Sequence, residues 1–364
     1  MDTQAPLTAI GAISGTSMDG IDVALVRTDG DALVQPGPGR TYPYAPALRA
    51  ALQDFLRDPA RAETDPLTVL EEQVSDAHAD AVAAFLRDHA IDRAGIAVAG
   101  IHGQTIWHRP ERRFTRQLGL GARIAARLGL PLVNRFRHAD VASGGQGAPF
   151  APLYHRALAA GLEPPVMVLN LGGVGNITYI DGDTVIAFDT GPASALIDDF
   201  VRQRRGQPYD ADGALAAAGT ADATLVARLM THPYFAAPAP KSLDRNHFHA
   251  WAAAVAGLAD ADGAATLTAF TVASVAASLR LVPAAPRRWL VCGGGRHNAD
   301  MMRRLRAELG VPVDPVEAAG WHGDFIEAEC FAYLAVRSLR GLPLSLPTTT
   351  GVPHPMPGGE RWTP

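Results

Sequence analysis

A short polar segment near the N-terminus carries the residue types expected of a phosphate-binding turn. Residues 15–22 read Gly-Thr-Ser-Met-Asp-Gly-Ile-Asp, and the first six of them join two apolar runs, 7–14 and 21–28, that predict strands. A tight turn rich in glycine and hydroxyl groups can direct several backbone N–H groups at a phosphate. It is not a Walker loop, because GxxxxGK[ST] occurs nowhere in the chain. An ordinary hairpin turn is the alternative, since hairpins also favour Asp and Gly.

Two acids in this segment favour the phosphate interpretation. Carboxylates beside a phosphate-binding turn can hold Mg²⁺, in part through water. Asp19 and Asp22 are therefore the candidate metal ligands. The whole segment supplies the first set of candidate nucleotide-binding residues: Gly15, Thr16, Ser17, Met18, Asp19, Gly20, Ile21 and Asp22.

Two further glycine-rich segments follow predicted strands in the second half. Residues 170–176, Asn-Leu-Gly-Gly-Val-Gly-Asn, lead into another strand rather than a helix, so they are a poor dinucleotide fingerprint. Gly172 and Gly173 are better candidates for a second phosphate turn. Residues 293–295, three consecutive glycines between a strand and a helix, leave room for a flat or charged group. The alternative is a glycine-rich loop with a packing role only.

One acid stands where a catalytic base could lie. Asp189 ends a predicted strand, 184–189, and Thr-Gly-Pro follows it before a helix. An Asp at that point can cap the helix or form the turn. A carboxylate at a strand end can also act as a general base. The residue types alone leave both interpretations open.

The elements that must position these residues repeat along the chain. Both halves begin with a strand, a glycine-rich turn and a second strand, and the second copy lies about 155 residues after the first. This repetition predicts a duplicated α/β domain. We expect domains at 1–165 and 166–323, and a strong final helix at 324–340. Residues 138–150 are expected to form a polar loop, and 264–280 a helix.

Composition limits the classes of function. The 364 residues have 48% hydrophobic and 19% charged side chains and a net charge of −5, which argues against a nucleic-acid partner. Lys241 is the only lysine. Two cysteines make no disulfide framework. No signal-peptide pattern opens the chain, and Asp260, Asp262 and Gly263 interrupt the longest Ala-rich stretch, so a cytoplasmic protein without a membrane span is expected.

Taken together, the motifs resemble one family over residues 10 to 351. The strings SGTSMDGID, HGQTIWHRP, NRFRHADVASGGQGAP, NLGGVGNIT, FDTGP, YDADGALAAAG, PKS and CGGGRHN occur in an order that is similar to the anhydro-N-acetylmuramic acid kinase family. The chain departs from the usual family pattern at five positions: Ala193, Ser194, Leu243, Asp244 and His297.

The resemblance implies a fold, a reaction and ligands. The fold would be two duplicated RNase H-like domains of the actin/hexokinase/Hsp70-like class, with an ATP-binding cleft between them and the segment 324–364 joined to the first domain. The reaction would open the anhydro bridge of the sugar with water while ATP phosphorylates O6. ATP, Mg²⁺ and the sugar would be the ligands, and a homodimer is implied.

The same resemblance assigns roles to single residues. Asp189 would be the base that deprotonates the water, and Glu327 would assist near the sugar; the alternative for Glu327 is a first-turn acid favoured by the helix dipole. Gly293, Gly294 and Gly295 would lie under the adenine. Three residues of the polar loop region would contact the sugar: Arg137, His138 and Gln146.

Three rival functions predict different behaviour. A kinase of the same fold with another acceptor would use Asp189 on a hydroxyl group instead of water. A non-catalytic nucleotide-binding module would bind ATP without sugar-dependent turnover. A glycosidase with two carboxylates would open the bridge without ATP.

Overall fold

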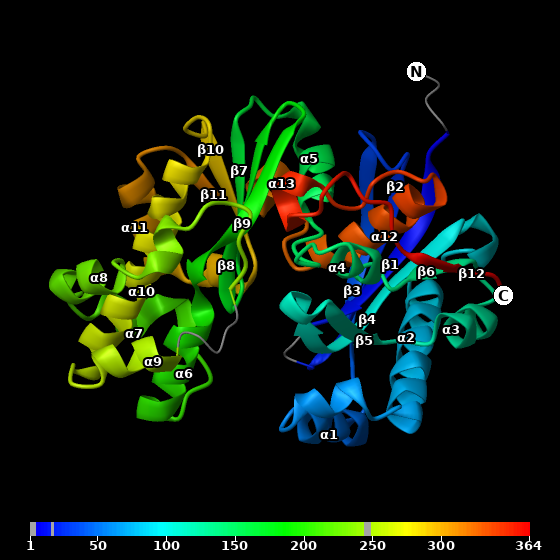
Figure 1. Ribbon diagram of the computed structural model, residues 1–364, viewed down its shortest axis with the longest axis horizontal. Coiled ribbons are helices and arrows are strands. Elements are labelled where there is room, and N and C mark those ends of the chain that lie inside the picture. The colour runs from blue at the N-terminus through cyan, green and yellow to red at the C-terminus, as the bar shows by residue number, and fades with distance from the viewer. Residues whose placement is uncertain (1–4, 16–17, 244–248) are drawn as a thin grey trace. The chain divides into compact units, whose positions relative to one another are not determined.

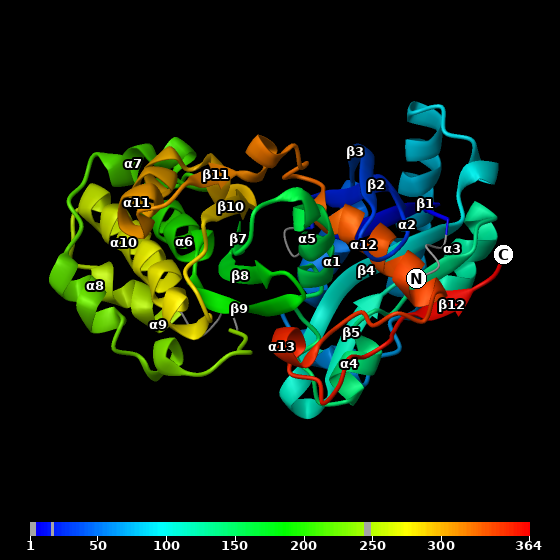
Figure 2. The same cartoon turned by 90° about the horizontal axis from the view of Figure 1, so that it is seen from above.

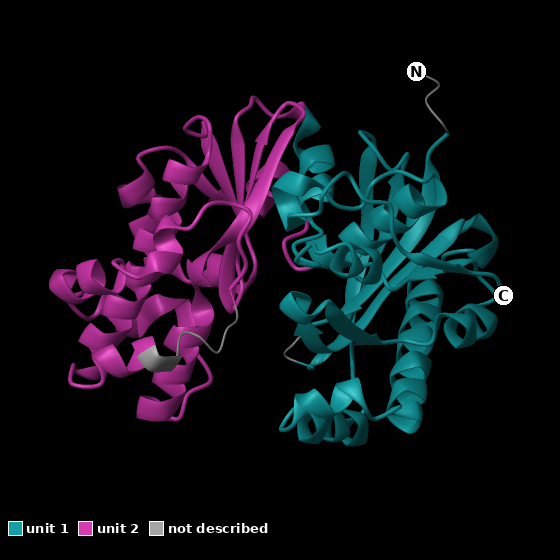
Figure 3. Cartoon of the chain, viewed as in Figure 1, with its two compact units in different colours: residues 1–160, 325–364 teal, residues 161–324 magenta. Residues whose placement is uncertain are grey.

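The chain folds into two compact units, each built around its own β-sheet. The computed structural model describes residues 5–15, 18–243 and 249–364 (Figure 1). Unit 1 comprises Met1–Ala160 and Phe325–Pro364, and unit 2 comprises Gly161–Asp324 (Figure 3). Unit 1 is therefore completed by the C-terminal end of the chain, whereas unit 2 is one continuous stretch.

The sheet of unit 1 has the order β12-β6-β4-β1-β2-β3, with β5 paired to β4. Strands β1, β2 and β3 form an antiparallel meander, while β4 and β6 add in parallel on the other side of β1. The strands are β1 (Leu7–Ser14), β2 (Gly20–Thr28), β3 (Val34–Pro43), β4 (Val98–Arg109), β5 (Phe114–Leu118), β6 (Leu132–Asn134) and β12 (Glu360–Trp362).

Helices pack on both faces of this sheet. Ile10 and Ala12 of β1 belong to the core that includes Val82 and Phe85 of α2, while the residue between them, Gly11, faces α12. Since successive strand residues point to opposite faces, α2 and α12 lie on opposite sides. The helices are α1 (Pro46–Phe55), α2 (Thr68–Asp88), α3 (Gly121–Leu128), α4 (His138–Ala142), α5 (Pro152–Leu158), α12 (Ile326–Leu339) and α13 (Pro347–Thr350).

Two glycines allow α12 to lie directly against the strands. A Cβ atom on Gly11 of β1 would be 1.8 Å from the Ala328 carbonyl oxygen, and one on Gly100 of β4 would be 2.1 Å from that of Phe331. Twelve of the fourteen residues of α12 are buried. The helix backbone thus occupies the space that side chains would take elsewhere in the sheet.

The sheet of unit 2 repeats the topology of unit 1. Its order is β11-β10-β7-β8-β9, with β7, β8 and β9 antiparallel and β10 and β11 added in parallel beyond β7. The strands are β7 (Val166–Leu171), β8 (Val174–Asp181), β9 (Thr184–Pro192), β10 (Arg288–Cys292) and β11 (Val313–Pro315). A meander extended by two parallel strands next to its first strand is the RNase H-like arrangement, so the expected duplicated fold class is confirmed.

Helix α10 forms the centre of the helical layer of unit 2, beside α6 and α11 (Figure 2). The helices are α6 (Ser194–Arg205), α7 (Ala214–Ala217), α8 (Ala223–Leu229), α9 (His249–Ala252), α10 (Asp260–Ala277) and α11 (Ala299–Leu309).

Residues Asp260, Asp262 and Gly263 belong to a long apolar helix, contrary to the expectation from the sequence. Asp260, Asp262 and Gly263 do not interrupt the apolar stretch, because they form the first turn of α10. Acids are favourable there, next to the positive end of the helix dipole. Residues 260–281 are long and apolar enough to cross a bilayer by length and composition, but 61% of an apolar 18-residue window within them is buried inside the protein. Such burial is typical of a core helix.

Candidate active site

The first glycine turn leaves β1 at Gly15 and returns to β2 at Gly20. The Met18 N–H donates to the Gly15 carbonyl at 3.2 Å, and Met18 adopts a left-handed conformation with φ of 54°. Thr16 and Ser17 lie outside the described residues. The side chains of Met18 and Ile21 are buried in the core, so these two candidates can offer a phosphate only backbone groups.

Gln104 of β4, which was not among the candidates from the sequence, holds the start of this turn. Its Oε1 accepts a hydrogen bond from the Ser14 hydroxyl at 2.6 Å, and its Nε2 donates to the Gly15 carbonyl at 3.2 Å. Gln104 is fully buried. The only signal was its place in the HGQT string, which by itself suggested no role.

The two candidate metal ligands differ in setting. Asp19 is exposed, whereas Asp22 lies half-buried on β2 and accepts a 2.6 Å hydrogen bond from the Thr41 hydroxyl. Within the described ranges no three His, Cys, Asp or Glu side chains form a metal-binding group. Mg²⁺ commonly uses one or two carboxylates together with phosphate oxygens. The donor set therefore fits a metal held jointly with a nucleotide and not one held by protein alone.

Arg137 is fixed by a histidine of β4. Its Nε donates to His102 Nε2 at 2.9 Å, while His102 Nδ1 lies 3.0 Å from the Gly103 carbonyl oxygen. A carbonyl can only accept, so Nδ1 carries the proton and Nε2 is the acceptor. Burial, reinforced by the Arg137 charge, holds the pKa of His102 well below its usual range, so it stays neutral.

Arg137 and Glu327 act on each other electrostatically. Burial raises the pKa of Glu327, the Arg137 charge lowers it, and Asp22 raises it again. The Glu327 residue is exposed to solvent, although many protein atoms surround its carboxyl group. In unit 1, three candidates that are far apart in sequence therefore interact electrostatically: Asp22, Arg137 and Glu327.

The region 138–150 is more ordered than the expected loop, because α4 occupies its first part. Asp140 of α4 is buried, and its two carboxylate oxygens accept from the Gly147 N–H and the Thr350 hydroxyl, both at 2.6 Å. The Gln146 N–H donates to the Thr350 carbonyl at 2.7 Å. Asp140 therefore anchors the loop that carries Gln146 to α13, a long-range contact that gave no signal in the sequence. His138, the remaining candidate, is half-buried at the start of α4.

The two glycine motifs of unit 2 lie together at the ends of β7 and β10. Gly293 adopts φ of +76°, and a Cβ there would be 2.3 Å from Asn170 Oδ1. A Cβ on Gly294 would meet nothing within 4 Å, and one on Gly172 or Gly173 would make only ordinary contacts. Packing therefore requires Gly293, while the other three positions leave open backbone that a ligand can approach.

Arg296 fixes the triple-glycine loop from one side. Its guanidinium donates to the Gly293 carbonyl at 3.1 Å, to Glu317 at 3.0 Å and to Asp324 at 2.6 Å. The third glycine, Gly295, packs against Leu171. The loop is thus held in one shape by an Arg that the sequence analysis passed over.

Asp189 lies within β9 and does not cap a helix. Ala193 occupies the N-cap position of α6, which rules out the capping alternative for Asp189. Asp189 Oδ2 accepts from the Leu243 N–H at 2.8 Å, and the Asp189 carbonyl accepts from the Tyr234 hydroxyl at 2.6 Å. Burial raises the pKa of Asp189 to about 7, although the Leu243 N–H and the Lys241 charge act against this rise. Such a carboxyl group is suited to accept and release a proton near neutral pH.

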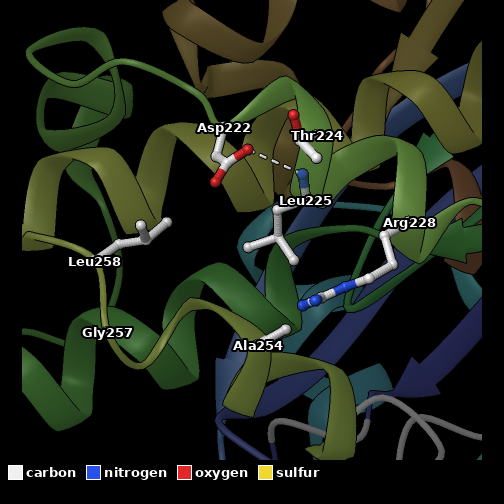
Figure 4. Close-up of a pocket in the computed structure, with 7 residues that line it drawn as sticks. All are labelled: Asp222, Thr224, Leu225, Arg228, Ala254, Gly257 and Leu258. Atoms are coloured by element: carbon white, nitrogen blue, oxygen red, sulfur yellow. Dashed lines mark hydrogen bonds between the residues drawn. The ribbon is translucent and has the colours of Figure 1, made fainter.

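A surface pocket elsewhere in unit 2 contains none of these residues. It is lined by Asp222, Thr224, Leu225, Arg228, Ala254, Gly257 and Leu258 (Figure 4). Asp222 caps α8 by accepting from the Leu225 N–H at 2.9 Å. The acid in this pocket therefore has a structural role.

Two RNase H-like units, each with a glycine turn after its first strand, place the protein in the actin/hexokinase/Hsp70-like fold class. The family model described as anhydro-N-acetylmuramic acid kinase matches residues 7–361. The chain belongs to this family.

Relatives from several bacteria carry the same family name. The anhydro-N-acetylmuramic acid kinase of Rhodospirillum rubrum is 53% identical over 97% of this chain and 94% of its own length. That of Acidiphilium cryptum is 54% identical over 97% of both chains. Among solved structures, component A of the Acidaminococcus fermentans (R)-2-hydroxyglutaryl-CoA dehydratase has a TM-score of 0.49 at 11% identity, covering 92% of this chain and 99% of that one. That likeness is too distant to bear on activity.

Proposed function

We propose that the protein is an ATP-dependent sugar kinase that converts 1,6-anhydro-N-acetylmuramic acid, ATP and water into N-acetylmuramic acid 6-phosphate and ADP. The reaction belongs to peptidoglycan recycling. Membership of the family supports the substrate. The observation that carries the chemistry is the half-buried Asp189, oriented through Tyr234 and Leu243 and with a pKa of about 7.

The bond changes explain why a base is required. The O6 atom of an anhydro sugar is bonded to C1 and carries no proton. Water therefore forms the new bond at C1, the C1–O6 bond breaks, and O6 takes the γ-phosphoryl group as ADP leaves. Asp189 accepts the proton that the attacking water loses. It must be ionised to do so, and hence turnover should rise with pH through about 7.

Unit 1 would bind and orient the sugar. Arg137 is held through His102 at one nitrogen, which leaves its other guanidinium groups to donate to a carboxylate or acetamide oxygen. Glu327, next to the Arg137 charge, would accept from a sugar N–H or O–H group. Gln146, whose backbone is held by the Thr350 carbonyl and by the His108 ring, would add a further polar contact.

The glycine turns would hold the nucleotide. Gly15 and Gly20 at the ends of one turn, with Gly172 and Gly173 in the other, offer backbone groups to phosphates. Gly294, open on its Cβ side, would allow a flat base to approach. Asp19 and Asp22 would hold Mg²⁺, which neutralises charge on the transferring phosphate. A cytoplasmic location and a homodimer complete the proposal, and the net charge of −5 gives no support for a nucleic-acid partner.

Isotope labelling tests both the substrate and the base. The wild type, Asp189→Asn and the control Asp183→Asn, which alters an exposed acid of the neighbouring hairpin turn, are incubated with the anhydro sugar, Mg-ATP and ¹⁸O-water. We expect ¹⁸O at the anomeric position of a 6-phosphosugar for the wild type and Asp183→Asn. Asp189→Asn should be slower by about 10³-fold or more, because a general base contributes roughly 10² to 10⁴.

Other outcomes would point to the rival functions. Label in the phosphate would place water attack at phosphorus and contradict the role of Asp189. Ring opening without ATP would indicate a glycosidase. ATP use that does not depend on the anhydro sugar would overturn the substrate and direct the search to other acceptors.

A further inference from the structure

A single segment of unit 2 contacts Asp189 on several sides. It begins in the short 3₁₀ turn Pro233–Ala236 and ends at Leu243. The Tyr234 hydroxyl donates to the Asp189 carbonyl at 2.6 Å, the Asp189 N–H donates to the Lys241 carbonyl at 2.9 Å, and the Leu243 N–H donates to Asp189 Oδ2 at 2.8 Å. Both the backbone and the carboxylate of Asp189 are thereby fixed by residues 45 or more positions later in the chain.

Lys241 is oriented by the same segment. Its Nζ donates to the Tyr234 carbonyl at 2.8 Å and lies 4.6 Å from the centre of the Tyr234 ring. It also lies 5.7 Å from the centre of the Phe188 ring, next to Asp189 in sequence. Aromatic faces favour a positive charge, most strongly where water is partly excluded. The only ammonium side chain in the protein is thus held over two rings, one of which belongs to the residue that precedes Asp189.

The charges of Lys241 and Asp189 stabilise each other. Burial lowers the pKa of Lys241 and the Asp189 charge raises it, while burial raises the pKa of Asp189 and the Lys241 charge lowers it. Among the described neighbours, Tyr234 is the other titratable group facing Asp189, and its pKa is raised well above the usual tyrosine value, first by burial and then by the Asp189 charge. The β8 partner of Asp189, Asn176, is uncharged. Lys241 is therefore the cation that balances Asp189 within the described part of unit 2.

We propose that residues 234–243 form a positioning strap for Asp189, in which Lys241 supplies the positive charge that keeps the carboxylate ionised until it takes the proton of the attacking water. The inference rests on the proposed function of Asp189 as the base. Lys241 stays protonated throughout, so no proton passes through it. Tyr234 has two roles in the strap: its hydroxyl orients Asp189, and its ring and carbonyl hold Lys241.

The pH dependence of kcat/KM tests the kinetic part. In the wild type, kcat/KM should rise with pH as Asp189 ionises. Lys241→Met should move this acid limb of the profile to higher pH by about one unit, so that kcat/KM falls roughly tenfold at pH values below the limb and changes little above it. Lys241→Arg should restore most of the wild-type profile. Arg49→Met, which removes the same charge from an exposed site on α1, should leave the profile unchanged. A uniform loss at every pH in Lys241→Met would overturn the role of its charge.

Tyr234→Phe separates orientation from charge. It removes the hydroxyl that contacts Asp189 but keeps the ring and carbonyl that hold Lys241. We expect kcat to fall about tenfold with the acid limb in place. Tyr209→Phe, at an exposed tyrosine, is the matched control. An unchanged kcat in Tyr234→Phe would contradict the role of the hydroxyl group in orienting Asp189.

A spectroscopic test does not depend on turnover. Because Lys241 is the only lysine, reductive methylation with ¹³C-formaldehyde gives one lysine signal beside that of the N-terminal amine. In the wild type this signal should shift as Asp189 titrates near pH 7, and Asp189→Asn should abolish that shift. Identical titrations in the two proteins would overturn the proposal even if the sugar kinase activity is established. A shift specific to the wild type would support the strap even if the substrate proves to be another acceptor.

Discussion

Asp189 should have opposite effects on catalysis and on stability. Its pKa is about 7 in the folded chain, against 3.8 for an unperturbed Asp, so the folded state binds the proton more tightly than the unfolded state does. The contribution of this group to stability is therefore fully present below about pH 4 and is lost as pH rises through about 7. The residue that the proposed reaction needs is one that the fold accommodates poorly in its working form.

Asp189→Asn should consequently stabilise the protein while slowing turnover by about 10³-fold or more. We expect a gain in the free energy of unfolding on the order of 1 kcal/mol or more at pH 8, because the neutral amide avoids the burial of a charge. At pH 4 the gain should vanish. Urea unfolding of the wild type, Asp189→Asn and Asp183→Asn at both pH values measures it. An equal gain at pH 4 and pH 8 would contradict the ionisation argument.

His102 should act on the sugar through Arg137. His102→Phe removes the acceptor for Arg137 Nε but keeps a flat ring against Phe331, whose ring centre lies 4.6 Å from that of His102. We expect KM for the anhydro sugar to rise about tenfold, the equivalent of one hydrogen bond, with KM for ATP changed little. His89→Phe, at the half-buried histidine that follows α2 as its C-cap, is the control. A change in KM for ATP alone would contradict the assignment.

At the residue scale, the sequence predicted the site motifs but did not predict the residues that hold them in place. Asp189 and the glycine turns stand out because acids and glycines are informative after strands. Gln104, Asp140 and Arg296 do not stand out, because each acts through a partner that is distant in sequence or lies in an unremarkable loop. Hydrogen bonds between positions such as 140 and 350 leave no local pattern to find.

At the scale of elements, the approach of α12 to its sheet depends on glycine. Gly11→Ala would place a methyl group 1.8 Å from a carbonyl oxygen of a helix with twelve buried residues, so the helix or the strand must move. We expect a loss of about 3 kcal/mol or more in the free energy of unfolding, or failure to fold. Gly95→Ala is the matched control, because its Cβ would meet nothing within 4 Å. Similar stability of the two variants would contradict the packing argument.

The strands and helices most apparent in the sequence were those with buried apolar runs. The strands expected at 7–14, 21–28 and 184–189 occur as β1, β2 and β9, and the helix expected at 264–280 is the main part of α10. Strand β3 was not expected, because Pro36, Pro38 and its glycines are unfavourable in a strand interior. They are tolerated because β3 is the last strand of its sheet.

At the scale of the whole molecule, the two units should differ in independence. Unit 2 is one continuous stretch, Gly161–Asp324, whereas unit 1 needs both ends of the chain. We expect the fragment 161–324 to unfold cooperatively by itself and the fragment 1–160 to remain unfolded, because it lacks the helix that covers one face of its sheet. Circular dichroism during thermal unfolding measures this. Cooperative unfolding of 1–160 alone would contradict the structural role given to α12.

Joining the C-terminal segment 325–364 directly to the fragment 1–160 should restore the folding of unit 1. A permuted chain that joins 325–364 directly to 1–160 contains every element of unit 1. It should regain cooperative unfolding. The duplication itself was predictable because the strand and glycine-turn pattern occurs twice, but only the strand order in the structure shows that both halves share one topology.

The position of α12 also sets the order in which a new chain can fold on the ribosome. Domains commonly fold as they emerge, N-terminal first. Here the N-terminal sheet must wait for a helix encoded roughly 180 residues later, on the order of 10 to 40 s at about 5 to 20 residues per second. The second domain can fold during that interval. Unit 1 is therefore completed after unit 2, with one apolar face of its sheet open to chaperones until α12 has been synthesised.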